Sequence, residues 1–134
     1  MSHALVSSIE PLTPGQERTI AALERFPLFG GLSRGQITDI ALQCSLHRVP
    51  AHRRVFEERE HSKGLWVITS GRVRLHHLMA DGRQHVVGFR APTAALDLTS
   101  AMDRRPYTAT ATTLEDAELV LVPGGLLQEL GELY

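Results

Sequence analysis

Apolar and polar positions alternate with a period of two along much of the chain after residue 44, a pattern typical of β-strands. The Thr/Ala alternation of Thr108–Thr113 is the clearest case. Gly, Pro or acidic residues separate the short segments with strand character, and Asp81-Gly82 predicts a tight hairpin. The other predicted strands are Ser45–Val49, Arg54–Glu57, Leu65–Thr69, Arg72–Met79, Gln84–Arg90 and Ala117–Val122. Many short strands at close spacing predict a β-sandwich or barrel.

Helical spacing is clearest near the two ends of the chain. Gln16–Phe26 has a partial apolar face and is followed by Pro27, which ends a helix. Ser33 and Gln36 form a capping-box pattern, so a second helix is expected from there to about Cys44. Its buried side is expected to hold Ile37, Ile40, Ala41 and Cys44.

A last short helix is predicted after Pro123, where Leu126, Leu127 and Leu130 recur at helical spacing. Residues 1–15 contain Ser, Pro and Thr with little periodicity, and they predict a flexible N-terminal arm. Residues 16–134 then form one domain, because a chain of 134 residues suffices for one modest core but not for two.

Composition and charge narrow the class of protein. The net charge of -1 gives no global basic field that would attract nucleic acid. No apolar run approaches the roughly 20 residues of a membrane span, and the first residues do not resemble a signal peptide. The single cysteine, Cys44, cannot form an internal disulfide or hold an iron–sulfur cluster. Together these features favour a cytoplasmic protein without a membrane partner.

The segment from Ala95 to Thr113 carries the candidate chemistry. A short helix-compatible piece follows Asp97, and helix N-termini are natural anion sites. Two arginines and small hydroxyl side chains lie in the same segment, so it predicts a cradle for a polar, anionic small molecule. The candidate ligand-binding residues are Asp97, Leu98, Thr99, Arg104, Arg105, Tyr107 and Thr108.

The order of landmarks resembles the N-terminal sensor half of Crp/Fnr-type transcription regulators. The most specific landmarks are the segment LWVITSGRVRL, the turn Asp81-Gly82-Arg83 and the closing Leu121-Val122-Pro123 before a helix. The resemblance covers about Phe26–Tyr134 and implies a mainly β, double-stranded β-helix (jelly roll) with short flanking α-helices. It also implies a ligand-sensing regulatory domain, with the pocket between the Ala95–Thr113 segment and the strands Leu65–Met79 and Gln84–Arg90.

The predicted cradle departs from the cyclic-nucleotide pattern of the family. That pattern has Gly-Glu followed by Arg-Ser/Thr-Ala, whereas this chain has Leu96-Asp97 and, in place of the arginine, Tyr107. We therefore expect weak or absent cyclic AMP binding, with Arg104 or Arg105 as the candidate substitute. The run MDRRPYTATATT is similar to the Dnr-like branch, which implies haem and nitric oxide sensing. The effector and any cofactor stay unknown at this point.

The histidines and arginines of the strand Arg72–Met79 have a structural interpretation. Adjacent residues on a strand point to opposite faces, so His76 and His77 cannot chelate one metal. His77 is expected to be half-buried with a local hydrogen bond, and His76 is expected on a solvated outer face with Arg72 and Arg74. No catalytic arrangement is evident, so the chain is not expected to be an enzyme. A cupin-like metal-dependent enzyme is the alternative, although it needs His-x-His and a following Glu.

A full regulator of the resembled family continues into a long dimerisation helix and a helix-turn-helix, and neither pattern is found here. The chain is then either a sensor domain cut from a larger regulator or a stand-alone binding module. The resemblance implies a homodimeric full-length protein that binds DNA through a domain missing from this chain. The present 134 residues are expected to be monomeric or weakly dimeric and not to bind DNA.

Overall fold

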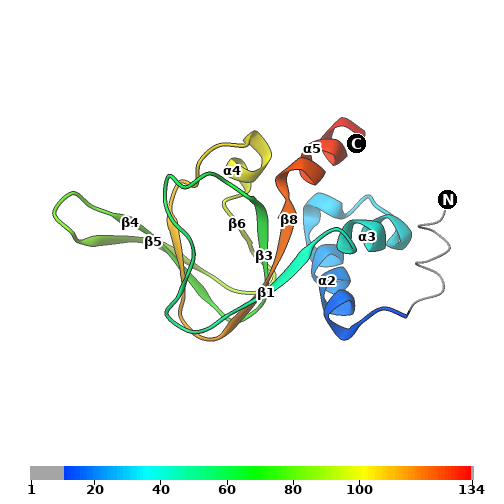
Figure 1. Ribbon diagram of the computed structural model, residues 1–134, viewed down its shortest axis with the longest axis horizontal. Coiled ribbons are helices and arrows are strands. Elements are labelled where there is room, and N and C mark those ends of the chain that lie inside the picture. Colours follow the sequence, from blue (N-terminus) through cyan, green and yellow to red (C-terminus); the bar gives the residue numbers. More distant parts are fainter. Residues whose placement is uncertain (1–10, 134) are drawn as a thin grey trace.

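Two antiparallel four-stranded sheets face each other in the computed structural model, which describes residues 11–133 (Figure 1). One sheet has the order β1 (Ser45–Val49), β8 (Ala117–Pro123), β3 (Gly64–Ser70), β6 (Ala95–Leu96). The other has the order β2 (Arg54–Phe56), β7 (Thr110–Thr113), β4 (Val73–Leu78), β5 (Gln84–Arg90). Neighbouring strands are mostly not consecutive in sequence, so the chain passes repeatedly between the sheets. The predicted mainly β jelly roll is confirmed.

The short helices lie at the ends of the chain and in one loop of the jelly roll. They are α2 (Pro14–Arg25), the 3-10 helix η1 (Pro27–Phe29), α3 (Arg34–Ala41), α4 (Leu98–Asp103) and α5 (Gly124–Leu133). The predicted capping box of Ser33 and Gln36 is present at the start of α3. That helix ends at Ala41, three residues before the predicted end at Cys44.

The first helix begins earlier than the sequence pattern predicts. Thr13 caps α2 with a second capping box, its side chain accepting a hydrogen bond from the Gln16 amide, and Pro14 occupies the first helical position. The helix start predicted at Gln16 is therefore wrong, because the cap and the first turn of the helix already include residues 13–15. Residues 1–10 of the predicted arm lie outside the described part of the chain.

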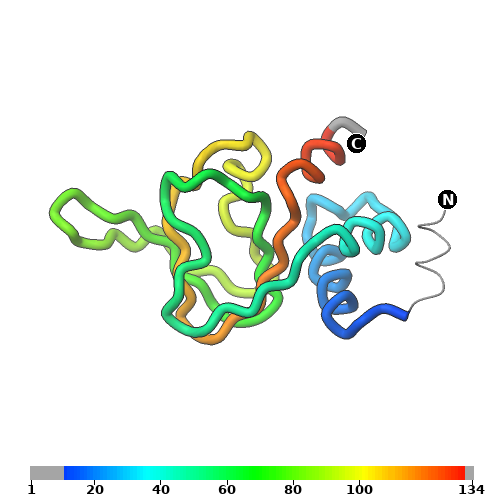
Figure 2. Tube along the Cα trace, in the orientation of Figure 1, coloured from blue at the N-terminus to red at the C-terminus, as the bar shows by residue number. Residues whose placement is uncertain are grey.

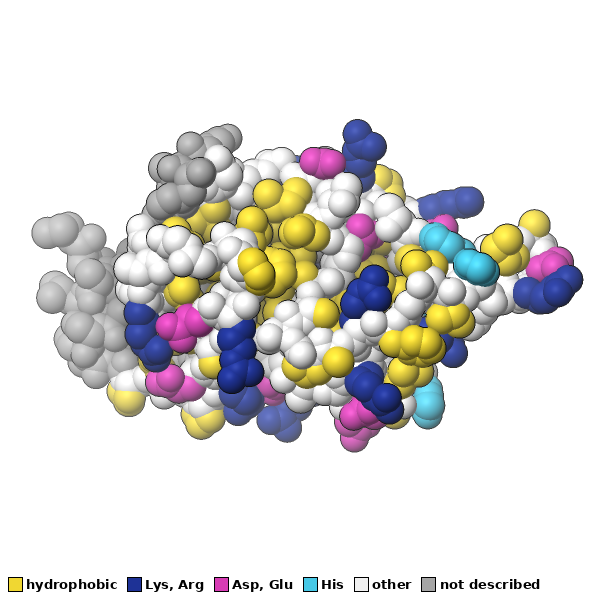
Figure 3. Space-filling model, turned by 180° about the vertical axis from the view of Figure 1, so that it is seen from behind, with side chains coloured by type: hydrophobic (Ala, Val, Ile, Leu, Met, Phe, Trp, Pro, Cys, Tyr) yellow, Lys and Arg dark blue, Asp and Glu magenta, His cyan; other side chains and the backbone are white. Residues whose placement is uncertain are grey.

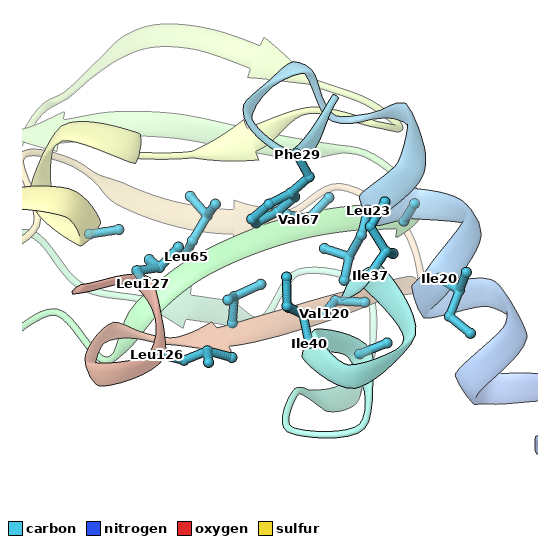
Figure 4. Close-up of a cluster of buried hydrophobic side chains, with 14 residues drawn as sticks. Ile20, Leu23, Phe29, Ile37, Ile40, Leu65, Val67, Val120, Leu126 and Leu127 are labelled. Atoms are coloured by element: carbon cyan, nitrogen blue, oxygen red, sulfur yellow. The ribbon is translucent and has the colours of Figure 1, made fainter. Parts of the chain in front are cut away.

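Two hydrophobic clusters pack on opposite faces of the β1-β8-β3-β6 sheet. Leu65 and Val67 of β3 point toward the helices, where Figure 4 shows them with Leu23 and Phe29. Trp66, from the same strand, packs in the other cluster, which lies between the two sheets. β3 is thus buried on both faces, which explains its nearly continuous apolar run. The prediction that Trp66 belongs to the core or its rim is confirmed by its 6% exposure.

The β4–β5 hairpin projects from the end of the molecule opposite the N-terminal helices (Figure 2). The predicted turn at Asp81-Gly82 is confirmed, and Gly82 supplies the positive φ of 87° that such a turn requires. The hairpin exposes several large apolar side chains, which Figure 3 shows at the right of its view. They are Leu78, Met79, Val86, Val87 and Phe89.

The strand predicted over Thr108–Thr113 begins two residues later, at Thr110. The backbone N–H of Thr108 donates to the carboxylate of Asp97 at 2.7 Å, so it is not free to join the strand ladder. The Thr/Ala alternation therefore predicts the strand correctly, while a side-chain contact over eleven residues sets where it starts.

A buried carboxylate ties the first helix to the β1-β8-β3-β6 sheet. The Glu118 carboxylate on β8 accepts two hydrogen bonds from the Arg18 guanidinium of α2, each at 2.9 Å, and a third from Thr69 at 2.7 Å. The hydrogen bonds from Arg18 lower the pKa of Glu118 below its ordinary value, while burial opposes this shift. The pair fixes the N-terminal half of α2 against the sheet.

This lowered pKa predicts a stability that depends on pH. A carboxylate whose folded pKa is depressed stabilises the fold above its unfolded pKa, about 4.3 for Glu. That contribution is lost as the pH falls through the lower folded pKa. Urea unfolding of the wild type between pH 7 and 3 is expected to show this loss, and Glu118→Gln is expected to give a shallower dependence over the same range. Equal pH profiles for the two proteins would contradict the assignment.

Candidate functional site

A pocket of about 380 Å³ lies on the inner side of the β4–β5 hairpin, beside β6 and the start of α4. Its position agrees with the pocket predicted between the Ala95–Thr113 segment and the two hairpin strands. The walls combine apolar side chains with a few polar ones. The lining residues are Phe56, Leu75, His77, Val87, Arg90, Ala95, Asp97, Leu98, Thr99, Thr108 and Ala109.

Asp97 organises the loop that forms one side of this pocket. It has a left-handed backbone conformation with φ of 53°, and one carboxylate oxygen caps α4 by accepting from the Ser100 amide at 3.3 Å. The other oxygen accepts from the backbone N–H of Thr108 at 2.7 Å and from its hydroxyl at 3.0 Å. The Ser100 hydroxyl also donates to the Pro106 carbonyl at 3.0 Å. The segment from Asp97 to Thr108 is therefore closed on itself by short polar contacts.

Four of the seven predicted ligand-binding residues line the pocket, namely Asp97, Leu98, Thr99 and Thr108. Arg104 and Arg105 do not line it, and both are exposed. Arg104 adopts a left-handed conformation at the end of α4, and its guanidinium donates to the side chain of Gln128 on α5 at 3.2 Å. The pocket lining thus does not support the predicted grip of these two arginines on the ligand, and the Arg104 side chain contacts α5 instead.

Tyr107 is also absent from the pocket lining, and the prediction that it contacts the ligand is not supported. Its side chain is 2% exposed and stacks on Phe56 with ring centroids 3.8 Å apart. Its hydroxyl accepts hydrogen bonds from Nε1 of Trp66 at 3.1 Å and from the backbone N–H of Lys63 at 3.0 Å. Tyr107 is a core residue, and its contacts anchor the Asp97–Thr108 segment to the core between the two sheets.

Removing that hydroxyl is expected to destabilise the protein. Tyr107→Phe keeps the stacked ring but leaves one buried donor, Trp66 Nε1, and one partly buried donor, Lys63 N, without this acceptor. A buried donor without a partner costs about 1–3 kcal/mol, so the free energy of unfolding should fall by at least that amount. Urea denaturation followed by circular dichroism measures the loss. In a Trp66→Phe background the loss should be smaller, and an unchanged loss would contradict the assigned contact.

Sequence reasoning missed two polar side chains that line the pocket. Arg90 is the only lysine or arginine among the lining residues. It pairs across the sheet with the buried Val73, and directly opposed residues share a face, so Arg90 belongs to the inner face. His77 has the predicted half-buried position and local hydrogen bond, with Nδ1 3.1 Å from a Glu58 carboxylate oxygen. The pairing of Arg90 with Val73 across the hairpin was the signal that could have placed Arg90 in the pocket.

His76 differs from the prediction of a solvated outer position. It does lie on the outer face of its sheet, but only 3% of it is exposed. Burial, and then the positive charges of Arg74 and Arg54, lower its pKa. The segment that follows β2 covers this part of the sheet, a long-range contact that strand periodicity cannot reveal. Among the described residues, no group of three His, Cys, Asp or Glu side chains is placed to hold a metal ion.

The comparisons with known proteins agree with this fold. Residues 46–134 match the family described as the cyclic nucleotide-binding domain, and the chain belongs to this family. It is 29% identical over 98 residues to the CRP-like cAMP-activated global transcriptional regulator of Mycobacterium tuberculosis, covering 73% of this chain and 44% of that protein. It is 28% identical over 95 residues to the cyclic AMP receptor protein of Thermus thermophilus, covering 70% and 44%. The chain therefore spans less than half the length of these curated relatives.

Solved structures extend the comparison. The N-terminal domain of a transcriptional regulator from Streptomyces coelicolor A3(2) is 29% identical, with a TM-score of 0.74, covering 84% of this chain and 78% of that chain. The sensor domain of the regulator DNR from Pseudomonas aeruginosa has a TM-score of 0.78 at 19% identity, covering 87% and 79%. At that identity the likeness to DNR shows the fold alone.

The predicted resemblance to the sensor half of Crp/Fnr-type regulators is confirmed by these matches, and the cupin alternative is not favoured. Haem and nitric oxide sensing remain a prediction. No helix within residues 11–133 is both long enough and apolar enough to cross a membrane.

Proposed function

We propose that the chain is the ligand-sensing domain of a Crp/Fnr-type transcription regulator, and that its effector binds in the pocket between α4 and the β4–β5 hairpin. The observation that carries this proposal is the joint position of Arg90 and Asp97 in the walls of one pocket in a cyclic nucleotide-binding domain. A guanidinium and a carboxylate in one partly apolar pocket favour a small molecule that carries both an anionic group and hydroxyl or amine donors.

The walls suggest how such a molecule is oriented. Arg90 donates through Nη1 to the carbonyl of Phe89 at 2.9 Å, which leaves its other N–H groups available for an anion. Asp97 already accepts from Thr108, so an effector hydroxyl there would share or replace that contact. Phe56, Leu75 and other apolar side chains cover the rest of the pocket. We therefore assign the anionic group to the Arg90 side and the donor groups to the Asp97 side.

Cyclic AMP is expected to bind weakly or not at all. The position of the family's phosphate-gripping arginine is taken by Tyr107, whose buried hydroxyl is already used by Trp66 and Lys63. Arg104 and Arg105, the substitutes that the sequence suggested, do not line the pocket. Arg90 approaches from a different strand, so it would place an anion differently from the family pattern.

A route from the pocket to the C-terminal helix supports a sensing role. Asp97 caps α4, and the last turn of α4 contacts α5 through Arg104 and Gln128. Met102 of α4 and Leu127 and Leu130 of α5 also line a shared apolar groove of about 280 Å³. An effector that prefers one position of α4 would thereby shift the population of α5 positions.

The larger context follows from the same proposal. The curated relatives are regulators more than twice as long as the matched region, so we propose that DNA binding and homodimer formation belong to the full-length protein. The relatives are named as a transcriptional regulator and a receptor protein, and we assign no catalytic activity to this chain. A role in transcription places the protein in the cytoplasm.

The experiment is a binding screen by isothermal titration calorimetry, preceded by an absorbance scan and native mass spectrometry of the purified protein. The panel contains cyclic AMP, cyclic GMP, other small phosphorylated metabolites, small dicarboxylates and haem. We expect at least one anionic compound to bind with micromolar affinity and cyclic AMP to bind more weakly. Failure of all the anions, or tight cyclic AMP binding with Arg90 removed, would overturn the proposed mode of recognition.

A further inference from the structure

A second, smaller pocket lies on the opposite side of β4 from the effector pocket. It has a volume of about 210 Å³, and its lining includes Arg54, Arg59, His76, Gln84 and Thr110. The residues come from β2, the segment after it, β4, β5 and β7, so four strands of one sheet contribute to a single hollow. His76 and His77 are adjacent in sequence but line different pockets.

Two buried polar atoms on this face of β4 lack hydrogen-bond partners. Nδ1 of His76 has none among the described residues, although only 3% of this residue is exposed. Nε of Arg74, two residues earlier on the same face, is also buried and unpaired in the described part of the chain. The Arg74 guanidinium is held in place because Nη2 donates to the Gln84 side chain at 3.1 Å. Buried polar groups are normally paired, so two orphans on one face point to a missing partner.

The charges around the hollow favour an anion as that partner. Arg54 and Arg59 line the hollow together with the carboxylates of Glu57 and Glu58, and Arg74 lies beside it, close enough to His76 to affect its pKa. Both carboxylates are already engaged. Glu57 pairs with Arg54, and Glu58 contacts His77 on the other side of the strand. Arg59 forms no ion pair among the residues that the structure describes. The three arginines outnumber the two glutamates, so the net charge of these five side chains is positive. Nε of Arg74 can only donate a hydrogen bond, which also favours an anion.

We propose that this hollow is a second ligand site, which takes a small oxyanion group between His76, Arg74 and Arg59. With its proton on Nδ1, His76 donates to one oxygen of the anion, and Nε of Arg74 donates to another. Arg59, exposed at the mouth, supplies a charge that is not compensated by a carboxylate. The site does not depend on the proposed function, because it lies on the other face of the sheet from the effector pocket.

The test is a titration of the full 134-residue chain with sodium sulfate, followed by NMR of the histidine rings and the backbone amides. Sodium chloride at equal ionic strength is the salt control. We expect saturable shifts at millimolar sulfate for the His76 ring and the Thr110 amide. Shifts that do not saturate, or that chloride reproduces, would overturn the proposal.

Variants separate a specific site from a general attraction to arginines. Arg59→Ala removes an exposed side chain at the mouth and should weaken sulfate binding at least about threefold. Arg53→Ala is the matched control, because Arg53 is an exposed arginine near β2 that does not line the hollow. Equal weakening by the two variants would contradict the site. His76→Phe tests the buried donor, and its loss of the sulfate-dependent Thr110 shift is expected if the variant folds.

A last comparison identifies the source of the oxyanion. Inorganic phosphate and glycerol phosphate carry the same group, one free and one attached to a larger molecule. Tighter binding of glycerol phosphate would assign the site to a phosphorylated metabolite, and equal or weaker binding would assign it to the free ion. Binding of neither one, together with no sulfate binding, would reject the site.

Discussion

Arg90→Ala is expected to weaken binding of the anionic effector by about ten- to a hundred-fold. The arginine is the only cationic side chain of the lysine or arginine type in the pocket wall, so no neighbour of that kind replaces it. A hydrogen bond to a charged group contributes about 1.5–3 kcal/mol, which corresponds to that range of affinity. Isothermal titration calorimetry with the best anion from the screen measures the change.

Arg105→Ala is the control for this prediction. Arg105 is exposed, lies in the same loop region as the ligand-binding candidates, and does not line the pocket. Its removal should leave the affinity within about twofold. The reverse result, a large loss for Arg105→Ala and none for Arg90→Ala, would restore the sequence-based assignment and contradict the pocket geometry. Arg90→Lys distinguishes charge from shape, because a lysine keeps the charge but not the planar fork of donors.

The fold was predictable because its signals are local. A period of two marks each strand, and the Asp81-Gly82 turn and the capping box of Ser33 and Gln36 need only neighbouring residues. The family resemblance then supplied the arrangement of strands, which no periodicity contains. Among the boundary errors, the one at Thr108 came from a longer contact, and the one at α2 came from a local capping box of Thr13 and Gln16 that the prediction overlooked. Asp97 holds Thr108 away from the strand ladder, and Thr13 starts α2 ahead of the apolar pattern.

The site was predictable only in part, because some of its residues meet through contacts between distant parts of the chain. Asp97 and Thr108 meet through a contact within one loop, and the sequence brought them together correctly. Arg90 enters the pocket through its register with Val73, which depends on how β5 pairs with β4. Tyr107 was assigned to the ligand because an arginine stands there in the family, but an aromatic ring is more stable in the core, stacked on Phe56.

The strongest effect on stability is expected at Gly64, where β3 begins. Its φ of 143° lies in a region that L side chains rarely adopt. A Cβ atom built on this residue would lie 2.1 Å from the Val122 carbonyl oxygen and 2.8 Å from the Gly124 amide nitrogen. Both contacts are to backbone, and neither can move aside by rotating a side chain. The pairing of β3 with the end of β8 therefore requires a glycine here.

Gly64→Ala is expected to lower the free energy of unfolding by about 3 kcal/mol or more, from backbone strain and from separation of β3 and β8. Urea denaturation followed by the fluorescence of Trp66, the single tryptophan, measures the loss. Gly131→Ala is the matched control, because a Cβ atom there meets nothing within 4 Å and the residue lies in α5. That substitution should raise stability by about 0.5–1 kcal/mol through helix propensity. Since Gly64 also contacts the start of α5, a tolerated Gly64→Ala would mean that the junction between β8 and α5 can shift freely, and α5 would then be poorly placed to report on the pocket.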